Sequence, residues 1–170
     1  MGRNLTAITL ADVGNGTAIV LTRGRRAAVI GCGGDYDAAA QVAAVLQSQN
    51  IDALDLLFLP RAAQTEASAA GQLLETVPAK TVVCAETVHE LPDGTHVIAA
   101  GAGRVRLWGD VTLEYITQGM LSCALLEIGT QRFFLSFCPG GDVSRLPEGW
   151  ICAPVAFCRA QGPKGPHAGG

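Results

Sequence analysis

The chain has 170 residues, of which 49% are apolar and 16% are charged, and its net charge at pH 7 is −3. This length suits one domain with a sizeable core, and the composition excludes a disordered protein. The acidic total gives no support to a basic nucleic-acid-binding surface, and no apolar run approaches the roughly 20 residues that cross a bilayer. The chain as given is therefore expected to be soluble.

Short strand-like runs separated by glycine turns open the chain. They cover residues 5–13, 17–22 and 26–31. A Gly-Asn-Gly turn and an Arg-Gly-Arg turn separate the runs, so the sequence predicts a three-stranded meander. The charges of Arg23, Arg25 and Arg26 are interpreted as a solvated hairpin tip, with a local basic patch as the alternative.

An α/β pattern follows. The expected elements are a helix capped by Asp35 or Asp37 and running to about Gln49, a strand at 55–60, a helix from about Glu66 to Thr76, and a strand at 81–85. The run at 55–60 is apolar without alternation, which is typical of a strand covered on both faces. Strands that alternate with helices in this way predict a layered α/β architecture.

The second half is strand-rich and has no convincing helix. Expected strands cover residues 95–100, 104–108, 110–117, 121–129, 131–137 and 150–157. Gly129-Thr130 predicts a tight hairpin between two of them. Two packed sheets with helices on the outside are therefore expected over residues 1–158, followed by a disordered Gly/Pro-rich tail at 159–170.

Several side chains outside these patterns allow both a structural and a functional interpretation. Cys32 at a glycine-rich bend is either an inert buried thiol or a reactive thiol at a helix start, while Cys84 and Cys123 are expected in the core. His89 and His96 flank a Pro-Asp-Gly turn and are expected on an exposed hairpin, with a metal pair as the alternative. The aromatic residues Trp108, Tyr115 and Trp150 are expected in core or edge packing rather than in base stacking.

Four stretches together resemble one family, the metallo-β-lactamase-like domain at the C-terminus of ComEC-type DNA-uptake channel proteins. The stretch 8-ITLADVGNGTAIVL-21 resembles its "DVGQGDA" opening, and 29-VIGCGGD-35 resembles its "IDGGG" strand end. The stretch 55-DLLFLPRAAQTEASAAGQLLETVPAKTVV-83 matches, without a gap, the family pattern "DLLVLTHPHADHIGGLxxLLExxPVKxVV". The stretch 121-LSCALLEIGTQRFFLSF-137 resembles "NSLVLRLEYGGRRFLLTGD". The resemblance implies a layered sandwich of two mixed sheets with outer helices.

The resemblance also implies metal-assisted phosphodiester hydrolysis by two zinc or manganese ions, held largely by a His-x-His-x-Asp-His loop. In this sequence the four ligand positions fall on Arg61, Ala63, Thr65 and Glu66. A guanidinium is a permanent cation that repels a metal ion, and alanine has no donor atom. Threonine is at best a weak neutral ligand, so only the glutamate could bind a metal.

The remaining ligand positions are changed as well. The metal-bridging Asp of the family falls on Phe137 or Cys138, or on Asp142 if residues 138–141 are an insertion. The later histidine pair of the family falls near Val155 and Ala156. The Asp of "IDGGG" is replaced by Gly31, and "GQGD" is replaced by Gly14-Asn15-Gly16-Thr17. So few donors would not hold an ion, and no metal cofactor is therefore expected.

We therefore expect a non-catalytic domain with a structural or interaction role in DNA uptake. Compared with the family, the domain is expected to be shortened at its C-terminus, either as a natural short form or as a fragment. Its expected partner is a membrane channel part or another competence protein, with membrane association if the chain belongs to a larger protein of that type; nucleic acid is a weakly supported partner. One alternative is a metal-dependent nuclease with a rebuilt site, whose residual carboxylates are Asp12, Asp35, Glu66 and Asp142. The other alternative is a binding module for another ligand.

Overall fold

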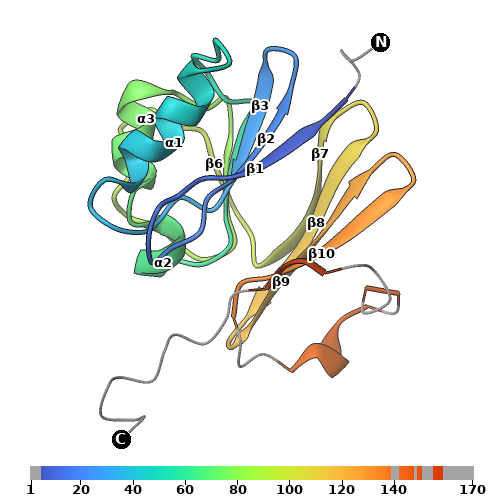
Figure 1. Cartoon of the computed structure of the whole chain (residues 1–170). Helices are drawn as coiled ribbons and strands as arrows, with labels where there is room; N and C mark the ends of the chain where they lie inside the picture. The colour runs from blue at the N-terminus through green and yellow to red at the C-terminus, as the bar shows by residue number, and fades with distance from the viewer. Residues whose placement is uncertain (1–4, 139–141, 148, 151–154, 159–170) are drawn as a thin grey trace, which may run out of the picture.

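Two β-sheets lie face to face, and helices cover the outer face of the first sheet (Figure 1). The computed structural model describes residues 5–138, 142–147, 149–150 and 155–158, the last four without their side chains. The expected tail at 159–170 and the insertion residues 139–141 lie outside this part of the chain. Within the described residues, no helix has the length and apolarity needed to cross a membrane.

The first sheet is mixed. Its strands, in spatial as well as chain order, are β1 (Ala7–Leu10), β2 (Ile19–Arg23), β3 (Arg26–Ile30), β4 (Leu56–Leu59), β5 (Val82–Cys84) and β6 (Val97–Ala99). Strands β1 to β3 pair antiparallel, which confirms the predicted meander, and β3 to β6 pair parallel. All four residues of β4 are buried, as expected from its unbroken apolar run.

The outer layer contains α1 (Ala38–Gln47), α2 (Gln64–Ala67) and α3 (Ala70–Thr76). Helix α1 begins after Asp37 and the chain leaves it through Asn50, whose φ of 60° suits the left-handed conformation of a helix end. The single helix expected from about Glu66 to Thr76 is wrong. The Ala69 amide donates to the Cys32 carbonyl at 2.9 Å, and this tertiary hydrogen bond separates α2 from α3.

The second sheet contains β7 (Ala102–Trp108), β8 (Val111–Gln118), β9 (Leu121–Ile128), β10 (Gln131–Ser136) and β11 (Val155–Cys158), in the order β11-β10-β9-β8-β7. Strands β7 to β10 form an antiparallel meander, and β11 pairs parallel with β10. The β9–β10 hairpin confirms the predicted turn at Gly129, whose φ is +61°. Apart from one 3-10 helix, Val143–Arg145, the described part of this half contains no helix.

The core lies in two main layers. One fills the space beneath the helices and includes Val42, Leu46 and Leu73, while the other lies between the sheets. In the second layer the ring of Phe58 lies 4.7 Å from Tyr115 and 6.4 Å from Phe137, centroid to centroid. The expected buried aromatic residues and cysteines are confirmed, since Trp108, Tyr115, Trp150, Cys84 and Cys123 are all buried.

Two expectations about exposed turns need correction. The hairpin expected between His89 and His96 is wrong, because β5 and β6 pair parallel and the chain between them crosses over without forming a strand. The β2–β3 hairpin carries the expected arginines, but they are not simply solvated. Arg23 forms an ion pair at 2.8 Å with Asp110, in the turn between two strands of the second sheet, and Arg26 forms one with Asp55 at 3.0 Å.

Candidate functional site

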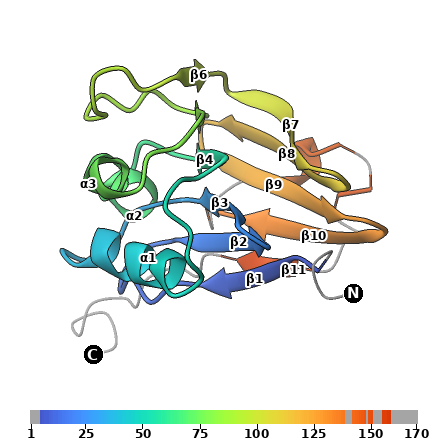
Figure 2. The ribbon, with the colours of Figure 1, turned by 90° about the horizontal axis from the view of Figure 1, so that it is seen from above.

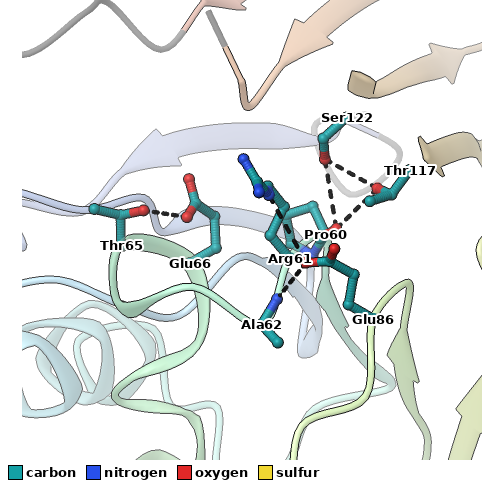
Figure 3. Close-up of polar contacts among 8 residues, drawn as sticks. All are labelled: Pro60, Arg61, Ala62, Thr65, Glu66, Glu86, Thr117 and Ser122. Atoms are coloured by element: carbon teal, nitrogen blue, oxygen red, sulfur yellow. Dashed lines mark hydrogen bonds and ion pairs between the residues drawn. The ribbon is translucent and has the colours of Figure 1, made fainter. Parts of the chain in front are cut away.

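Residues 60–66 comprise the loop at the carboxyl end of β4 and the first three residues of α2; we call this segment the ligand-position loop (Figure 3). Its first carbonyl, that of Pro60, accepts hydrogen bonds from the Thr117 hydroxyl at 2.8 Å and the Ser122 hydroxyl at 3.4 Å. These buried hydroxyls come from β8 and β9 and lie 2.9 Å apart. The loop is therefore anchored to the second sheet at the point where it leaves the first.

Glycine-rich segments pack directly against this loop. The Thr17 amide donates to the Thr65 carbonyl at 2.8 Å, and the Cys32 amide donates to the Glu66 carbonyl at 2.7 Å. A Cβ added to Gly33 would lie 2.4 Å from the Gln64 carbonyl oxygen, closer than real Cβ atoms approach. Glycine is therefore needed here so that two backbone segments can pack against each other.

Arg61 occupies the first ligand position. Its Nε atom lies 3.7 Å from Oε1 of Glu86, a residue just after β5. The Ala62 amide donates to the same carboxylate oxygen at 2.9 Å. Glu86 therefore ties the backbone and one side chain of the ligand-position loop to the neighbouring strand. Because 25% of the Arg61 side chain and 37% of the Glu86 side chain are exposed, the ion pair itself contributes about 1 kcal/mol or less.

Glu66, at the last ligand position, is 1% exposed and accepts a hydrogen bond from the Thr65 hydroxyl. In Figure 3 the side chains of Arg61 and Glu66 project from the same side of the loop. A buried carboxylate needs hydrogen bonds or a nearby cation. The loop thus combines a permanent cation with one buried carboxylate where the family pattern has metal ligands.

Of the other candidate carboxylates, Asp12 and Asp35 lie on segments that are joined by a hydrogen bond from the Asp35 amide to the Val13 carbonyl at 2.8 Å, and Asp142 lies after β10. Asp12 and Asp35 are exposed, and Asp35 accepts a hydrogen bond from the Asn15 amide at 3.3 Å. Asp142 is exposed too, and hydrogen bonds from Ser144 hold the pKa of its carboxyl below the usual range. Within the described residues, no group of three or more His, Cys, Asp or Glu side chains could hold a metal ion.

The remaining ligand positions carry buried or undescribed side chains. Phe137 and Cys138 are buried, and the phenylalanine side chain has no donor atom for a metal ion. The side chains of Val155 and Ala156 are not among those that the structure describes.

Cys32 lies under the ligand-position loop and is fully buried. Burial raises the pKa of its thiol to about 12, so at neutral pH the group is a neutral thiol. The alternative of a reactive thiolate at the start of a helix is therefore wrong, because desolvation outweighs any stabilisation of the charged form.

A groove of about 590 Å³ lies beside the ligand-position loop, between α3 and the segment at 87–90. Ala62 and Ala63 form one end of it, and Glu75 and Glu90 are the charged groups of its lining. Gly71 lets the two walls approach, since a Cβ there would lie 2.4 Å from the Glu90 carbonyl oxygen. Sequence reasoning missed this groove because its second wall is an irregular segment whose position depends on tertiary structure.

Solved structures of metallo-β-lactamase fold proteins are similar to this chain at low sequence identity. The metallo-β-lactamase fold protein YhfI from Bacillus subtilis is 11% identical with a TM-score of 0.52, and the match covers 76% of this chain and 60% of that one. ETHE1 from Myxococcus xanthus is 18% identical with a TM-score of 0.52, covering 77% of this chain and 56% of that one. The metallo-β-lactamase SMB-1 bound to 2-mercaptoethanesulfonate is 11% identical with a TM-score of 0.53, and the match covers 78% of this chain and 66% of that one.

This chain therefore has the metallo-β-lactamase-like α/β sandwich fold, as predicted. It spans less than two thirds of the length of each of these three structures. No protein-family model matches the sequence, and no curated protein matches it.

Proposed function

We propose that this chain is a non-catalytic domain of the metallo-β-lactamase fold with a structural or interaction role, related to the C-terminal domain of ComEC-type DNA-uptake proteins. The observation that carries the proposal is the state of the ligand-position loop. Arg61 stands at its first ligand position, within 3.7 Å of Glu86. The cation and the loop backbone thus share a protein carboxylate instead of a metal ion.

The donor chemistry supports this proposal. A zinc or manganese pair needs several imidazole and carboxylate donors that converge on it. Of the four loop positions only Glu66 carries such a donor, and Asp12, Asp35 and Asp142 are not gathered around it in the described structure. A few carboxylate oxygens that do not converge on one point bind a metal ion too weakly to retain it through purification.

The groove beside the loop supports an interaction role. Among the described residues its lining contains the carboxylates of Glu75 and Glu90 and the imidazole of His89, but no Lys or Arg. An acidic groove repels a phosphate backbone and attracts basic groups. We therefore favour a protein partner over nucleic acid at this groove. The link to a DNA-uptake channel rests on the sequence stretches at 8–21, 29–35 and 55–83.

Metal analysis and a cleavage assay on the same preparation test the proposal. The purified chain is dialysed against zinc or manganese, freed of unbound metal, analysed for bound metal, and incubated with single-stranded DNA. We expect metal well below one equivalent and no cleavage. One or more equivalents of metal together with cleavage that EDTA abolishes would overturn the proposal and favour the rebuilt nuclease site. Binding of DNA without metal would instead favour a general binding module.

A further inference from the structure

Strand β1 is an open edge of the first sheet. It pairs antiparallel with β2 on one side, and among the described residues no strand pairs with its other side. Figure 2 shows β1 along one margin of the sandwich, with β6, the other edge strand of this sheet, at the opposite margin.

The backbone of β1 presents free hydrogen-bonding groups at this edge. Along an antiparallel pair, residues that bond to the neighbouring strand alternate with residues whose N–H and C=O groups point away from it. The Ala11 amide donates to the Ala18 carbonyl at 2.9 Å, so Ala11 is one of the residues that bond towards β2. By this alternation Thr9 also bonds to β2, and the backbone groups of Ile8 and Leu10 point to the open edge.

The side chains of Ile8 and Leu10 are exposed on the inner face of the first sheet. Ile8 pairs with Leu21, and Leu10 pairs with Ile19. Both β2 residues belong to the core between the sheets, and cross-strand partners point to the same face. The two β2 side chains are at most 1% exposed, whereas Ile8 is 41% exposed and Leu10 is 62% exposed. The cover of this apolar face therefore ends between β2 and β1.

This edge carries no charge. Natural edge strands are usually guarded against pairing with another chain by charged side chains or proline. The stretch 5-LTAITLA-11 contains neither. The start of the strand is also held in place, because the Thr6 hydroxyl accepts a hydrogen bond from Arg23 at 3.0 Å and Arg23 forms an ion pair with Asp110. An uncharged, apolar strand fits this edge better than a charged one.

A second copy of β1 meets these requirements. Two copies related by a two-fold axis pair antiparallel, and the free backbone groups of Ile8 then face those of the second copy's Leu10. In this register Thr9 lies opposite Thr9 at the axis, and each Ile8 side chain lies beside a Leu10 side chain on the inner face. A register centred on Ile8 would instead place Leu10 opposite Thr6, which covers less apolar surface.

We propose that β1 forms the interface of a symmetric dimer, in which it pairs antiparallel with β1 of a second copy of this chain and joins the two first sheets into one. The pairing adds about four backbone hydrogen bonds and covers Ile8 and Leu10 of both copies. One pair of strands is smaller than a standard protein interface, so we expect a dissociation constant on the order of 10 to 100 µM. Such a dimer does not require the function proposed for the ligand-position loop.

Sedimentation equilibrium of the full chain, from about 1 µM to about 500 µM, tests the association. We expect a monomer–dimer equilibrium. Leu10→Lys should weaken it at least about tenfold, because it removes apolar surface from the interface and places a charge beside the second copy's Ile8. Met120→Lys makes the same change at an apolar side chain of similar exposure in the turn between β8 and β9, and it should leave the equilibrium unchanged.

Disulfide cross-linking tests the register. Thr9→Cys should give a covalent dimer on mild oxidation, because Cα atoms opposite each other in a non-hydrogen-bonded pair lie about 4.5 Å apart, within reach of a disulfide. Ala7→Cys should not, because the two copies of position 7 are separated by about 13 Å along the paired strands. The wild type, which carries only the native cysteines, is the control and should give no covalent dimer.

Each variant is first checked for an unchanged circular dichroism spectrum and a cooperative thermal transition, and Ile8→Lys replaces Leu10→Lys if that variant fails. A monomer at every concentration would overturn the proposal and leave this edge to a strand of another protein. Equal effects of Leu10→Lys and Met120→Lys would overturn it too, as would cross-linking of Ala7→Cys as readily as Thr9→Cys.

Discussion

The carboxylate of Glu86 joins two loops: its Oε1 atom lies 3.7 Å from Nε of Arg61 and accepts a hydrogen bond from the Ala62 amide at 2.9 Å. One side chain from the end of β5 therefore holds the loop that follows β4. A metal site would require this loop to present four donors to an ion. In this chain the loop is instead held by contacts with the protein itself.

Replacement of Glu86 should loosen the ligand-position loop without unfolding the protein. Glu86→Ala removes an ion pair and a backbone hydrogen bond that are both partly exposed, so we expect a loss of about 1 kcal/mol. Urea denaturation measures this loss, and hydrogen exchange of the Ala62 amide should become faster. Glu75→Ala, at an exposed residue of the groove beside the ligand-position loop, is the matched control and should change neither quantity. Equal effects of the two substitutions would show that Glu86 has no special role.

A larger effect is expected where the glycine loop meets the ligand-position loop. A Cβ at position 33 would lie 2.4 Å from the Gln64 carbonyl oxygen and 2.6 Å from the Glu66 amide nitrogen. Gly33→Ala must push two backbone segments apart, so we expect a loss of about 3 kcal/mol in urea denaturation. Gly24→Ala meets no atom within 4 Å and is strained only by its φ of +61°, so it should cost about 1 kcal/mol. A Gly33→Ala protein as stable as Gly24→Ala would contradict the close packing.

Two substitutions on β8 test the hydrogen bond that anchors the ligand-position loop to the second sheet. Thr117→Val removes the hydroxyl that donates to the Pro60 carbonyl at 2.8 Å and contacts Ser122. Burial of these groups predicts a loss of about 2 kcal/mol, moderated because Ser122 also reaches the carbonyl at 3.4 Å. Thr112→Val makes the same change at a less buried position of β8 and should be nearly neutral. Thermal unfolding compares the two variants, and equal shifts would count against the anchor.

The buried thiol of Cys32 should make the free energy of unfolding fall at alkaline pH. Its thiol pKa is raised from 9.0 to about 12 by burial, so the folded state favours the neutral thiol. The stabilisation is complete below pH 9, where the unfolded chain is also protonated, and is lost as pH rises from 9 towards 12. Cys32→Ala should therefore flatten the fall in stability above pH 9 seen in denaturant titrations. In the native protein Cys32 should also resist a thiol reagent at neutral pH, and fast labelling there would disprove this account.

Local patterns were sufficient to predict much of the fold. The unbroken apolar run of β4, the Gly129 turn and the early glycine turns each follow from short stretches of sequence. The metallo-β-lactamase fold itself was predicted from the resemblance and is confirmed, while the relation to ComEC-type proteins stays a prediction.

Features that depend on tertiary contacts could not be predicted in the same way. The break between α2 and α3 depends on a hydrogen bond from Ala69 to Cys32, which lie far apart in the sequence. The parallel pairing of β5 and β6 likewise depends on the sheet and not on the turn residues between them. At the candidate site, the loss of ligand donors was visible in the sequence, but the contact between Arg61 and Glu86 was not.

The central claim, that the ligand-position loop does not hold a metal pair, is tested most directly by the bound metal content of the protein after equilibration with zinc or manganese. We predict well below one equivalent of either metal, with the same value in wild type and in Glu66→Gln. One or two equivalents of tightly bound metal in the wild type, reduced in the Glu66→Gln variant, would contradict it.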